Sequence, residues 1–438
     1  MAISLSKILN NSLSGEIPDE EEIKFLLNIE DKESLKRLCH AAGKIKESIY
    51  GKRIVLFTPL YLSNECLNNC VYCAFRRDNK DIKRKTLNTD EIILQARALE
   101  KTGFKRVLLV AGEHPDNCSL DYLIDAVKAI YKNTGIRIVH LNAAPFLEEE
   151  FIKLKSSGIG VFQLFQETYH PETYTKMHPG GKKGDFIWRR LAMERAISAG
   201  IKDVGIGALF GLYDYKFEVT ELIRHSRELE NKFGFGPHTI SVPRLRPAHG
   251  AQLQKPPFPV SDFDFKKIVA VLRLAVPYTG IVVTTREQPS LRDEIIYFGA
   301  SQISAGSHTE PGGYGKNDSV LTAEDGQFFI ADKRTLEEMI KTIIDKNLIP
   351  SLCTSCYRIG RTGENFLNKT KHGEIQQFCL PNALLTLKEY ALDFASPDIK
   401  KIIERSINDN IKYLNKSSFN RFQEKLNKIN NGERDLYF

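Results

Sequence analysis

Three cysteines stand close together in the first third of the chain, with a spacing that suits a metal cluster. Cys66, Cys70 and Cys73 have three and then two residues between them. Three thiolates in one loop can bind an iron–sulfur cluster, and because four ligands are the usual complement, one iron keeps an open site for a small molecule. Tyr72 and Phe75 would shield such a cluster from water. A zinc site or a set of reduced structural cysteines is the alternative, but zinc sites mostly use paired Cys-x-x-Cys units and a fourth ligand, which this loop lacks.

A second set of cysteines follows near the end of the chain. Cys353 and Cys356 form a Cys-x-x-Cys unit, and Cys379 follows after twenty-two intervening residues. Such a unit alone is typical of a redox pair or half a zinc site. With one distant third cysteine and no fourth, the set again indicates a cluster with an open iron. The chain has eight cysteines, and the remaining two, Cys39 and Cys118, are expected to be buried or incidental thiols.

Length and composition narrow the classes of protein. The chain has 438 residues, 42% hydrophobic and 27% charged, which is typical of a soluble globular protein with one large barrel and an appendage. The formal net charge of +7 is spread along the chain without a basic stripe, so we expect no nucleic-acid partner. Residues 1–7 contain no long apolar run, so we expect neither a secretory signal nor a membrane span. The expected location is the cytoplasm.

The pattern from residue 51 onward predicts strands that alternate with helices. Eight apolar or β-branched runs are the predicted strands: Ile54–Leu62, Arg106–Ala111, Ile136–Ala143, Gly160–Gln166, Val204–Phe210, Thr239–Val242, Ile281–Thr285 and Ile303–Ala305. Amphipathic segments lie between them: Thr89–Thr102, Leu120–Asn133, Phe186–Ala199, Glu218–Phe233 and Asp262–Ala275. Eight strands with intervening helices predict an α/β fold of the (β/α)8, TIM-barrel type.

The same pattern divides the chain into three parts. Residues 1–50 are predicted to form an N-terminal helical segment, in which the acidic run from Asp19 to Glu22 opens a helix at its positive end. Residues 51–314 form the barrel. Residues 315–438 are predicted to be a mostly helical domain that holds the second set of cysteines.

The position of the first cysteine set supports a catalytic role. The loop follows the first predicted strand, so it lies at the C-terminal mouth of the barrel, where barrel enzymes keep their active sites. Its Cys-x3-Cys-x2-Cys spacing resembles that of the radical S-adenosylmethionine (SAM) enzymes. The resemblance implies a [4Fe–4S] cluster that binds SAM at its open iron and cleaves it to a radical.

The resemblance also assigns residues to SAM. Gly112 and Glu113 follow the second strand, where such enzymes hold the methionyl amine with backbone carbonyls. Glu167 would bond the ribose or amine, and Arg190 or Arg195 the carboxylate, because an arginine fork suits that group. Ile206 lies between two glycines that allow a backbone to approach the adenine, although a small-residue strand in a tight barrel explains them nearly as well.

The second cysteine set and several segments make the resemblance more specific. They are similar to the SAM-dependent tyrosine lyases, and the cysteine set separates the maturases of FeFe hydrogenase from the thiamine thiazole enzyme, which lacks it. The resemblance covers nearly the whole chain and is carried by Phe165–His170, Gly205–Tyr213, Gly236–Ser241, Ser301–Ser307 and Pro381–Tyr390. It implies cleavage of L-tyrosine to p-cresol and dehydroglycine, which becomes CO and cyanide on a second [4Fe–4S] cluster. The implied partners are an electron donor and other hydrogenase maturation proteins. In a eukaryote, the resemblance implies a hydrogenosome or plastid as the location.

Two alternatives stay open. One is 2-iminoacetate synthase of thiamine synthesis, and the other is a non-catalytic iron–sulfur scaffold. The second cysteine set argues against the first alternative. The barrel and the SAM-like turns argue against the second, because a scaffold needs no pocket for SAM or tyrosine.

His238 is expected at the other end of the barrel from the first cysteine set. It begins the sixth predicted strand, and a strand of about eight residues at ~3.3 Å each separates the two ends by roughly 25 Å. A lone strand histidine is ordinarily a hydrogen-bonded core residue. The resemblance implies that His238 instead ligates an extra, dangling iron beside the second cluster, and imidazole is a good ligand for iron.

The carboxylate of an amino-acid substrate needs a cation or several donors. Arg286, near the top of the seventh strand, is the best candidate, and Arg292 is the second. Ser304 and Ser307 on the eighth strand can donate hydrogen bonds to the same group. The alternative is that the two arginines form structural ion pairs and that the two serines lie at the rim of the barrel without contacting a ligand.

Overall fold

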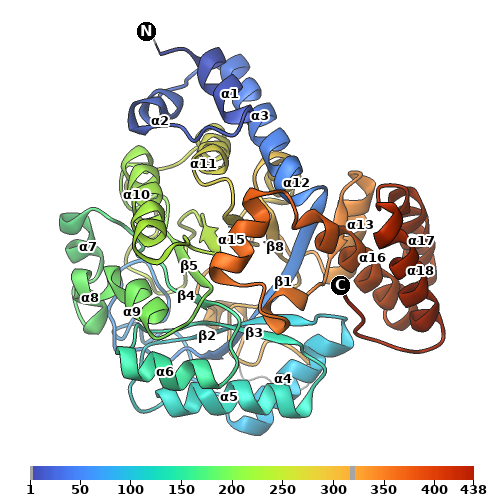
Figure 1. The fold of residues 1–438 in the computed structure, drawn as a ribbon. Helices are drawn as coiled ribbons and strands as arrows, with labels where there is room; N and C mark the ends of the chain where they lie inside the picture. Colours follow the sequence, from blue (N-terminus) through green and yellow to red (C-terminus); the bar gives the residue numbers. More distant parts are fainter. Residues whose placement is uncertain (1–2, 316–320) are drawn as a thin grey trace.

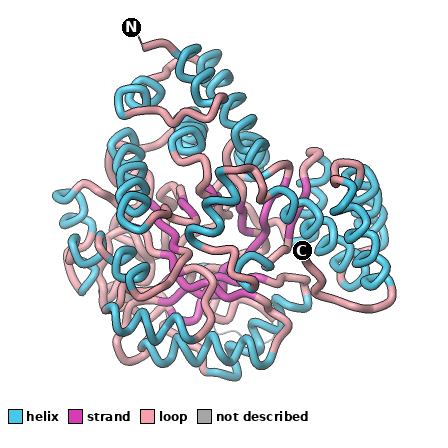
Figure 2. Tube along the Cα trace, in the orientation of Figure 1, coloured by secondary structure: helices cyan, strands magenta, loops and turns pink. Residues whose placement is uncertain are grey.

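A closed barrel of eight parallel strands forms the centre of the computed structural model, which describes residues 3–315 and 321–438. The strands pair in chain order, and β1 closes the ring by pairing with both β2 and β8. They are β1 (Arg53–Ser63), β2 (Arg106–Ala111), β3 (Ile138–Asn142), β4 (Phe162–Gln163), β5 (Val204–Gly207), β6 (Thr239–Ser241), β7 (Gly280–Val283) and β8 (Gln302–Ser304). Figure 2 shows them gathered at the centre with helices around them. The predicted (β/α)8 fold is confirmed, with strand ends that differ by a few residues.

A ninth strand, β9 (Ile349–Ser351), extends the sheet at the bottom of the barrel. On one side of β1, the upper part from Thr58 pairs with β2, whereas Arg53–Val55 pairs with β9. Because β9 leads directly into Cys353, this pairing brings the second cysteine set to the bottom of the barrel.

Helices cover the barrel and form both ends of the chain (Figure 1). The N-terminal helices are α1 (Leu5–Leu13), α2 (Glu20–Leu27) and α3 (Lys32–Tyr50). Those of the barrel are α4 (Thr89–Lys101), α5 (Leu120–Asn133), α6 (Glu148–Ser156), α7 (Pro171–Met177), α8 (Phe186–Arg190), α9 (Ala192–Ser198), α10 (Tyr215–Phe233), α11 (Asp262–Ala275) and α12 (Pro289–Phe298). The C-terminal helices are α13 (Leu336–Asp345), α14 (Ser355–Arg358), α15 (Gly363–Lys371), α16 (Gln376–Asp393), α17 (Pro397–Ile411) and α18 (Lys416–Asn430). Short 3-10 turns, η1 and η2, span Lys182–Gly184 and Ala323–Asp325.

Local sequence explains where these helices begin. Asp19, Asn88 and Thr335 each accept a hydrogen bond from the backbone three residues later, and a glutamate at that position bonds back to the cap. This reciprocal pair satisfies backbone donors that the first helical turn leaves free. The apolar faces of the helices pack onto the barrel in one continuous core.

The C-terminal part is mostly helical, as predicted. Helix α16 packs against α17, α18 and β9, beside the barrel (Figure 1). The proposed boundary at 314/315 adjoins residues 316–320, which lie outside the described part of the chain. After them, Gln327 and Phe328 return to the mouth of the barrel and line its cavity. No helix within the described residues is long and apolar enough to span a membrane.

Candidate active site and second cysteine site

One cavity opens at the C-terminal ends of the barrel strands, and the first cysteine set lines it. Cys66, Cys70 and Cys73 follow β1 and face this cavity together. The rings of Tyr72 and Phe75 are buried and line the same space. The loop therefore lies at the mouth of the barrel, where the strand order predicted it.

The cysteine loop is held against the turn that follows β2. Asn68 donates a hydrogen bond to the Glu113 carboxylate at 2.6 Å, and the Glu113 backbone N–H donates to the Cys66 sulfur at 3.4 Å. A Cβ at Gly112 would lie 2.1 Å from the carbonyl oxygen of Glu65. Only glycine therefore fits at this crossing, because any side chain would push the two loops apart.

The donor set fits a cluster rather than a single ion. Burial raises the pKa of the Cys70 thiol to about 12 and that of Cys73 to about 11, so these thiols need a cation beside them to ionise. Across the described residues, no three His, Cys, Asp or Glu side chains converge as ligands of one metal ion. An iron–sulfur cluster is a larger body whose ligands stand farther apart.

Glu167 faces the same cavity in a strained backbone conformation. Its φ is 71°, which is rare for a residue with a side chain. Its carboxylate accepts a hydrogen bond from Lys183 at 2.7 Å, and Arg189 lies 3.7 Å away. Burial raises the pKa of Glu167, but Lys183 and Arg189 more than offset this, so the pKa lies below its ordinary value. Both cations also line the cavity, and sequence reasoning missed them.

The arginines assigned to SAM lie elsewhere, and so does the side chain of Ile206, for which the expected contact with SAM is through the backbone and stays a prediction. Arg190 pairs with Glu228 and covers the ring of Tyr169. Arg195 stacks on the Trp188 ring, 3.6 Å from its centroid, and donates to a backbone carbonyl. The side chain of Ile206 is buried in the apolar core. None of the three lines the cavity, and Arg189 occupies the position expected of an arginine there.

Arg286, Ser304 and Ser307 also line this cavity. The Arg286 guanidinium lies over the Phe328 ring, 3.2 Å from its centroid. Burial lowers its pKa, and it forms no ion pair within the described chain. The buried hydroxyl of Ser307 has no hydrogen-bond partner in that part either. A half-buried cation and a free hydroxyl beside an open cavity fit an anionic group of a ligand.

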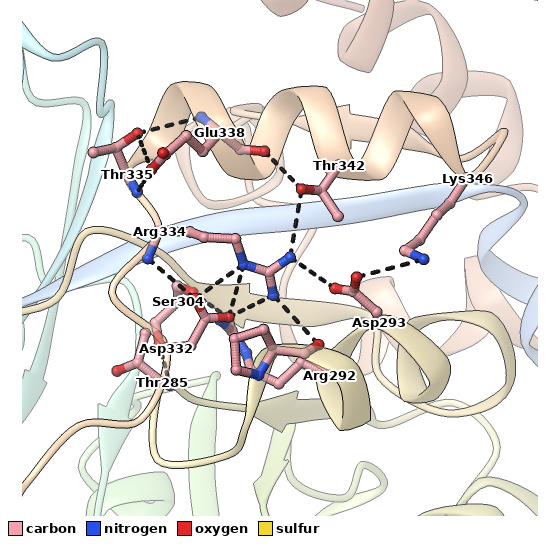
Figure 3. A network of polar contacts seen from close by, with 11 residues as sticks. Thr285, Arg292, Asp293, Ser304, Asp332, Arg334, Thr335, Glu338, Thr342 and Lys346 are labelled. Carbon is pink, nitrogen blue, oxygen red and sulfur yellow. Dashed lines mark hydrogen bonds and ion pairs between the residues drawn. The ribbon is translucent and has the colours of Figure 1, made fainter.

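Arg292 does not reach the cavity and belongs to the network in Figure 3. Its guanidinium pairs with the buried Asp332 and donates to the carbonyl of Ser304. Arg334 binds Asp332 from the other side at 2.5 Å and Asp293 at 2.9 Å. With its charge neutralised by Asp332, Arg292 supports the strand that carries Ser304 and is not available to a substrate carboxylate.

A second cavity lies at the bottom of the barrel, and the second cysteine set lines it. Cys353, Cys356 and Cys379 face it together with His238. Burial raises the pKa of Cys356 to about 12 and also raises that of Cys379. His238 therefore lies beside the second set, as the strand order predicted.

Arginines surround the second cavity. The side chains of Arg53 and Arg106 line it, and Arg361 stacks on Phe378, which also lines it. The Nε atoms of all three are buried without a hydrogen-bond partner among the described residues. Three cations with unused donors suit a group that carries negative charge, such as an iron–sulfur cluster bound by thiolates.

The two cavities divide the interior of one barrel. Along β1, Arg53 and Val55 line the lower cavity, and Phe57, Pro59 and Tyr61 line the upper one. Alternate residues of a strand face the same side, so these five form one continuous inward face. The barrel axis therefore connects the two cysteine sites.

Comparisons with known proteins agree with this geometry. Residues 60–225 match the Radical SAM superfamily, and residues 241–349 match the Biotin and Thiamin Synthesis associated domain. A crystal structure of HydG, a maturase of the [FeFe]-hydrogenase, is 47% identical, covers 99% of this chain and 95% of its own, and superposes with a TM-score of 0.95. The HydG structure from Carboxydothermus hydrogenoformans is 41% identical, with a TM-score of 0.85 and coverage of 96% and 93%.

A curated relative is less similar in sequence than these two structures. The 2-iminoacetate synthase of Escherichia coli (strain K12) is 34% identical over 320 residues, 72% of this chain and 82% of the relative. The barrel, the three-cysteine loop and the superfamily match define a radical SAM enzyme. The superfamily's chemistry implies a [4Fe–4S] cluster that works with SAM. Within that class, the chain belongs to the HydG family of [FeFe]-hydrogenase maturases.

Proposed function

We propose that the protein cleaves L-tyrosine between Cα and Cβ and converts the amino-acid fragment to CO and cyanide for hydrogenase maturation. The observation that carries the proposal is the pair of cysteine-lined cavities at the two ends of one barrel. The two-step reaction balances: tyrosine divides into p-cresol and dehydroglycine, and dehydroglycine has the atoms of CO, hydrogen cyanide and water.

The upper site would bind SAM and tyrosine together. Cys66, Cys70 and Cys73 would hold the cluster, which when bound supplies the electron that cleaves SAM to a 5′-deoxyadenosyl radical. Gly112, Glu113 and Glu167 line the same cavity as the cysteines, where they would contact SAM. Arg189 takes the role first assigned to Arg190 or Arg195.

The substrate carboxylate would bind beside Arg286 in the same cavity. Arg286 supplies the charge, and Ser304 and Ser307 supply hydroxyls. Tyr72 and Phe75 keep water away, which protects a radical from side reactions. The radical would take a hydrogen atom from the tyrosine amine, and the Cα–Cβ bond would then break to dehydroglycine and a 4-hydroxybenzyl radical. One electron from the electron donor and one proton would convert that radical to p-cresol.

The lower site would complete the reaction. Cys353, Cys356 and Cys379 would hold the second cluster, and His238 an extra iron at which CO and cyanide are collected. Dehydroglycine would travel along the inside of the barrel, so that a reactive intermediate and toxic diatomics do not escape. An electron donor and the other maturation proteins are the partners that this function requires.

The second candidate is the reaction of 2-iminoacetate synthase, favoured by the 34% identity to the Escherichia coli enzyme. That reaction needs the upper site alone. A non-catalytic scaffold is disfavoured, because it would have no use for Arg286, a half-buried cation that faces a cavity and forms no ion pair among the described residues.

The test is anaerobic reconstitution with iron and sulfide, followed by iron counting and product analysis with SAM, tyrosine and dithionite. We expect 5′-deoxyadenosine, p-cresol and CO. The triple variant Cys66→Ala, Cys70→Ala, Cys73→Ala should keep about half of the cluster iron and form none of these products. Formation of p-cresol without CO by the unaltered protein would favour the synthase reaction, and 5′-deoxyadenosine from the triple variant would overturn the radical assignment.

A further inference from the structure

His238 stands in the wall between the lower cavity and a neighbouring one, and both of its ring nitrogens face protein groups. Nε2 lies 3.0 Å from the hydroxyl of Tyr357. Nδ1 lies 3.3 Å from Oδ1 of Asp203. His238 lines both cavities, whereas Tyr357 lines only the cavity of the second cysteine set and Asp203 only the neighbouring one. The two nitrogens therefore face different cavities.

Asp203 is built into the base of the barrel directly before β5. It is buried, with 2% of its surface exposed, and its Oδ1 accepts a hydrogen bond from the Gly363 backbone N–H at 3.1 Å. Its other oxygen, Oδ2, has no hydrogen-bond partner in the described residues, and neither has Nδ1 of His238. Two buried polar atoms without partners thus lie on adjacent side chains, close but not aligned for a hydrogen bond.

The chemistry of the two groups determines which nitrogen carries the proton. A neutral imidazole has one N–H and one lone pair. An ionised carboxylate only accepts hydrogen bonds, so it favours the tautomer with the proton on Nδ1. The lone pair then lies on Nε2, which faces the cysteine-lined cavity. Histidines that bind metals commonly donate their second nitrogen to a carboxylate, which fixes both the tautomer and the ring.

We propose that Asp203 is the positioning residue that prepares His238 to bind iron through Nε2. The inference rests on the proposed iron site and extends it to a residue outside that cavity. The hydroxyl of Tyr357 occupies the same lone pair, so iron must displace it. A slight turn of the ring, freed from Tyr357, would align Nδ1 with Asp203 and complete the carboxylate–histidine–iron arrangement.

The informative variant is Asp203→Asn. Asparagine keeps an oxygen for the Gly363 N–H, so the local fold is preserved. The same oxygen, Oδ1, faces Nδ1 of His238, and in asparagine it is neutral and a weaker acceptor, so the preference for the tautomer with the proton on Nδ1 is reduced. Loss of such a carboxylate typically weakens metal binding ~10- to 100-fold. Tyr357→Phe, by contrast, should bind the extra iron at least as tightly as the unaltered protein.

The experiment titrates ferrous iron into the cluster-reconstituted protein and counts bound iron. Pulsed electron paramagnetic resonance on protein labelled with ¹⁵N-histidine detects the nitrogen bound to iron. The variants are Asp203→Asn, Tyr357→Phe, His238→Ala and, as a control, Glu230→Gln, which changes an acidic residue of the neighbouring cavity that pairs with Lys371. Cluster absorbance and the thermal midpoint report whether each variant folds.

We expect Asp203→Asn to lose affinity for the extra iron and the nitrogen coupling, while both clusters and p-cresol formation persist and Glu230→Gln behaves as the unaltered protein. Unchanged affinity and coupling in folded Asp203→Asn would overturn the inference, provided that His238→Ala loses the extra iron. If His238→Ala also keeps it, the proposed iron ligand is wrong, and the role of Asp203 falls with it.

Discussion

The ammonium of Lys183 lies 2.7 Å from Oε1 of Glu167 inside the upper cavity. The two residues come from different segments, and the turn that carries Glu167 is fixed from behind. Glu218, buried on α10, accepts hydrogen bonds from the Thr168 hydroxyl and the Tyr169 backbone N–H. A negative charge is thereby held in a cavity that also contains three thiols, and among the cations that keep it ionised Lys183 has the largest effect.

We therefore predict that Lys183→Met makes SAM affinity depend on pH. Without Lys183, the burial of Glu167 is opposed mainly by Arg189, so its pKa rises from its lowered value. A carboxylate with a raised pKa is lost as the pH falls, and SAM binding should weaken with it. Calorimetric titration of the reconstituted protein across the neutral range measures this. Lys182→Met, at the adjacent exposed position, should match the unaltered protein, and a flat profile for Lys183→Met would contradict the prediction.

Arg286→Ala should weaken the binding of tyrosine much more than that of SAM. Losing a charge-assisted hydrogen bond costs ~1.5–3 kcal/mol, or roughly ten- to a hundredfold in affinity. The measurement is the tyrosine dependence of 5′-deoxyadenosine formation, beside a direct SAM titration. Arg286→Lys should recover only part of the effect, because a lysine cannot form the planar, two-point contact of a guanidinium. Equal tyrosine affinity in Arg286→Ala would move the role to another donor.

Asp332→Ala should destabilise the fold. Asp332 is fully buried between Arg292 and Arg334, and removing one partner of a buried pair costs ~3–5 kcal/mol because a charge is left unpaired. Asp293→Ala, at a partly exposed carboxylate of the same network (Figure 3), should cost less. Thermal unfolding midpoints measure both.

The pairing of Asp332 with Arg292 and Arg334 also makes the stability of the fold depend on pH. Burial raises the pKa of Asp332, but hydrogen bonds from Arg334 and the charge of Arg292 more than offset this and lower it. A carboxylate with a lowered pKa stabilises the fold above the ordinary carboxyl pKa, and this stability is lost as the pH falls through the lowered value. Asp332→Asn should therefore lose less stability on acidification than the unaltered protein.

The fold could be predicted from the sequence because the barrel strands are runs of β-branched and apolar residues, and eight of them alternate with helices. Strand β9 could not, since it has three residues and contains Pro350, which argues against a strand. The pairing of β9 with Arg53–Val55 is non-local. Only the structure shows that this pairing brings Cys353 beneath the barrel.

Residues of the candidate site could be predicted where their spacing or the strand order places them. They could not be predicted where the direction of the side chain determines whether a residue faces the cavity. Cys66, Cys70 and Cys73 lie within eight residues, so their meeting follows from the sequence. Arg189 and Arg190 are adjacent on a helix of five residues, too short for periodicity to show which one faces the cavity. Asp332, which neutralises Arg292, comes forty residues later from an irregular segment.

The lower site should be needed for CO but not for tyrosine cleavage. Cys353 and Cys356 line only the lower cavity, and the residues that would hold SAM and tyrosine line the upper one. The double variant Cys353→Ala, Cys356→Ala should therefore form p-cresol at a measurable rate and release little or no CO. His238→Ala should act more narrowly, because the histidine would hold only the extra iron: p-cresol should persist and iron-bound CO should fall.

Both products are measured in one anaerobic assay, p-cresol by chromatography and CO by trapping on deoxyhaemoglobin. Cys39→Ala is the matched control, since Cys39 is a free cysteine that lines neither cysteine cavity, and its CO-to-p-cresol ratio should equal that of the unaltered protein. The ratio is the informative quantity, because a variant that merely folds less well loses both products together. If the double variant makes CO at the unaltered ratio, the lower cysteines are structural, and the conversion of dehydroglycine must take place at the upper site.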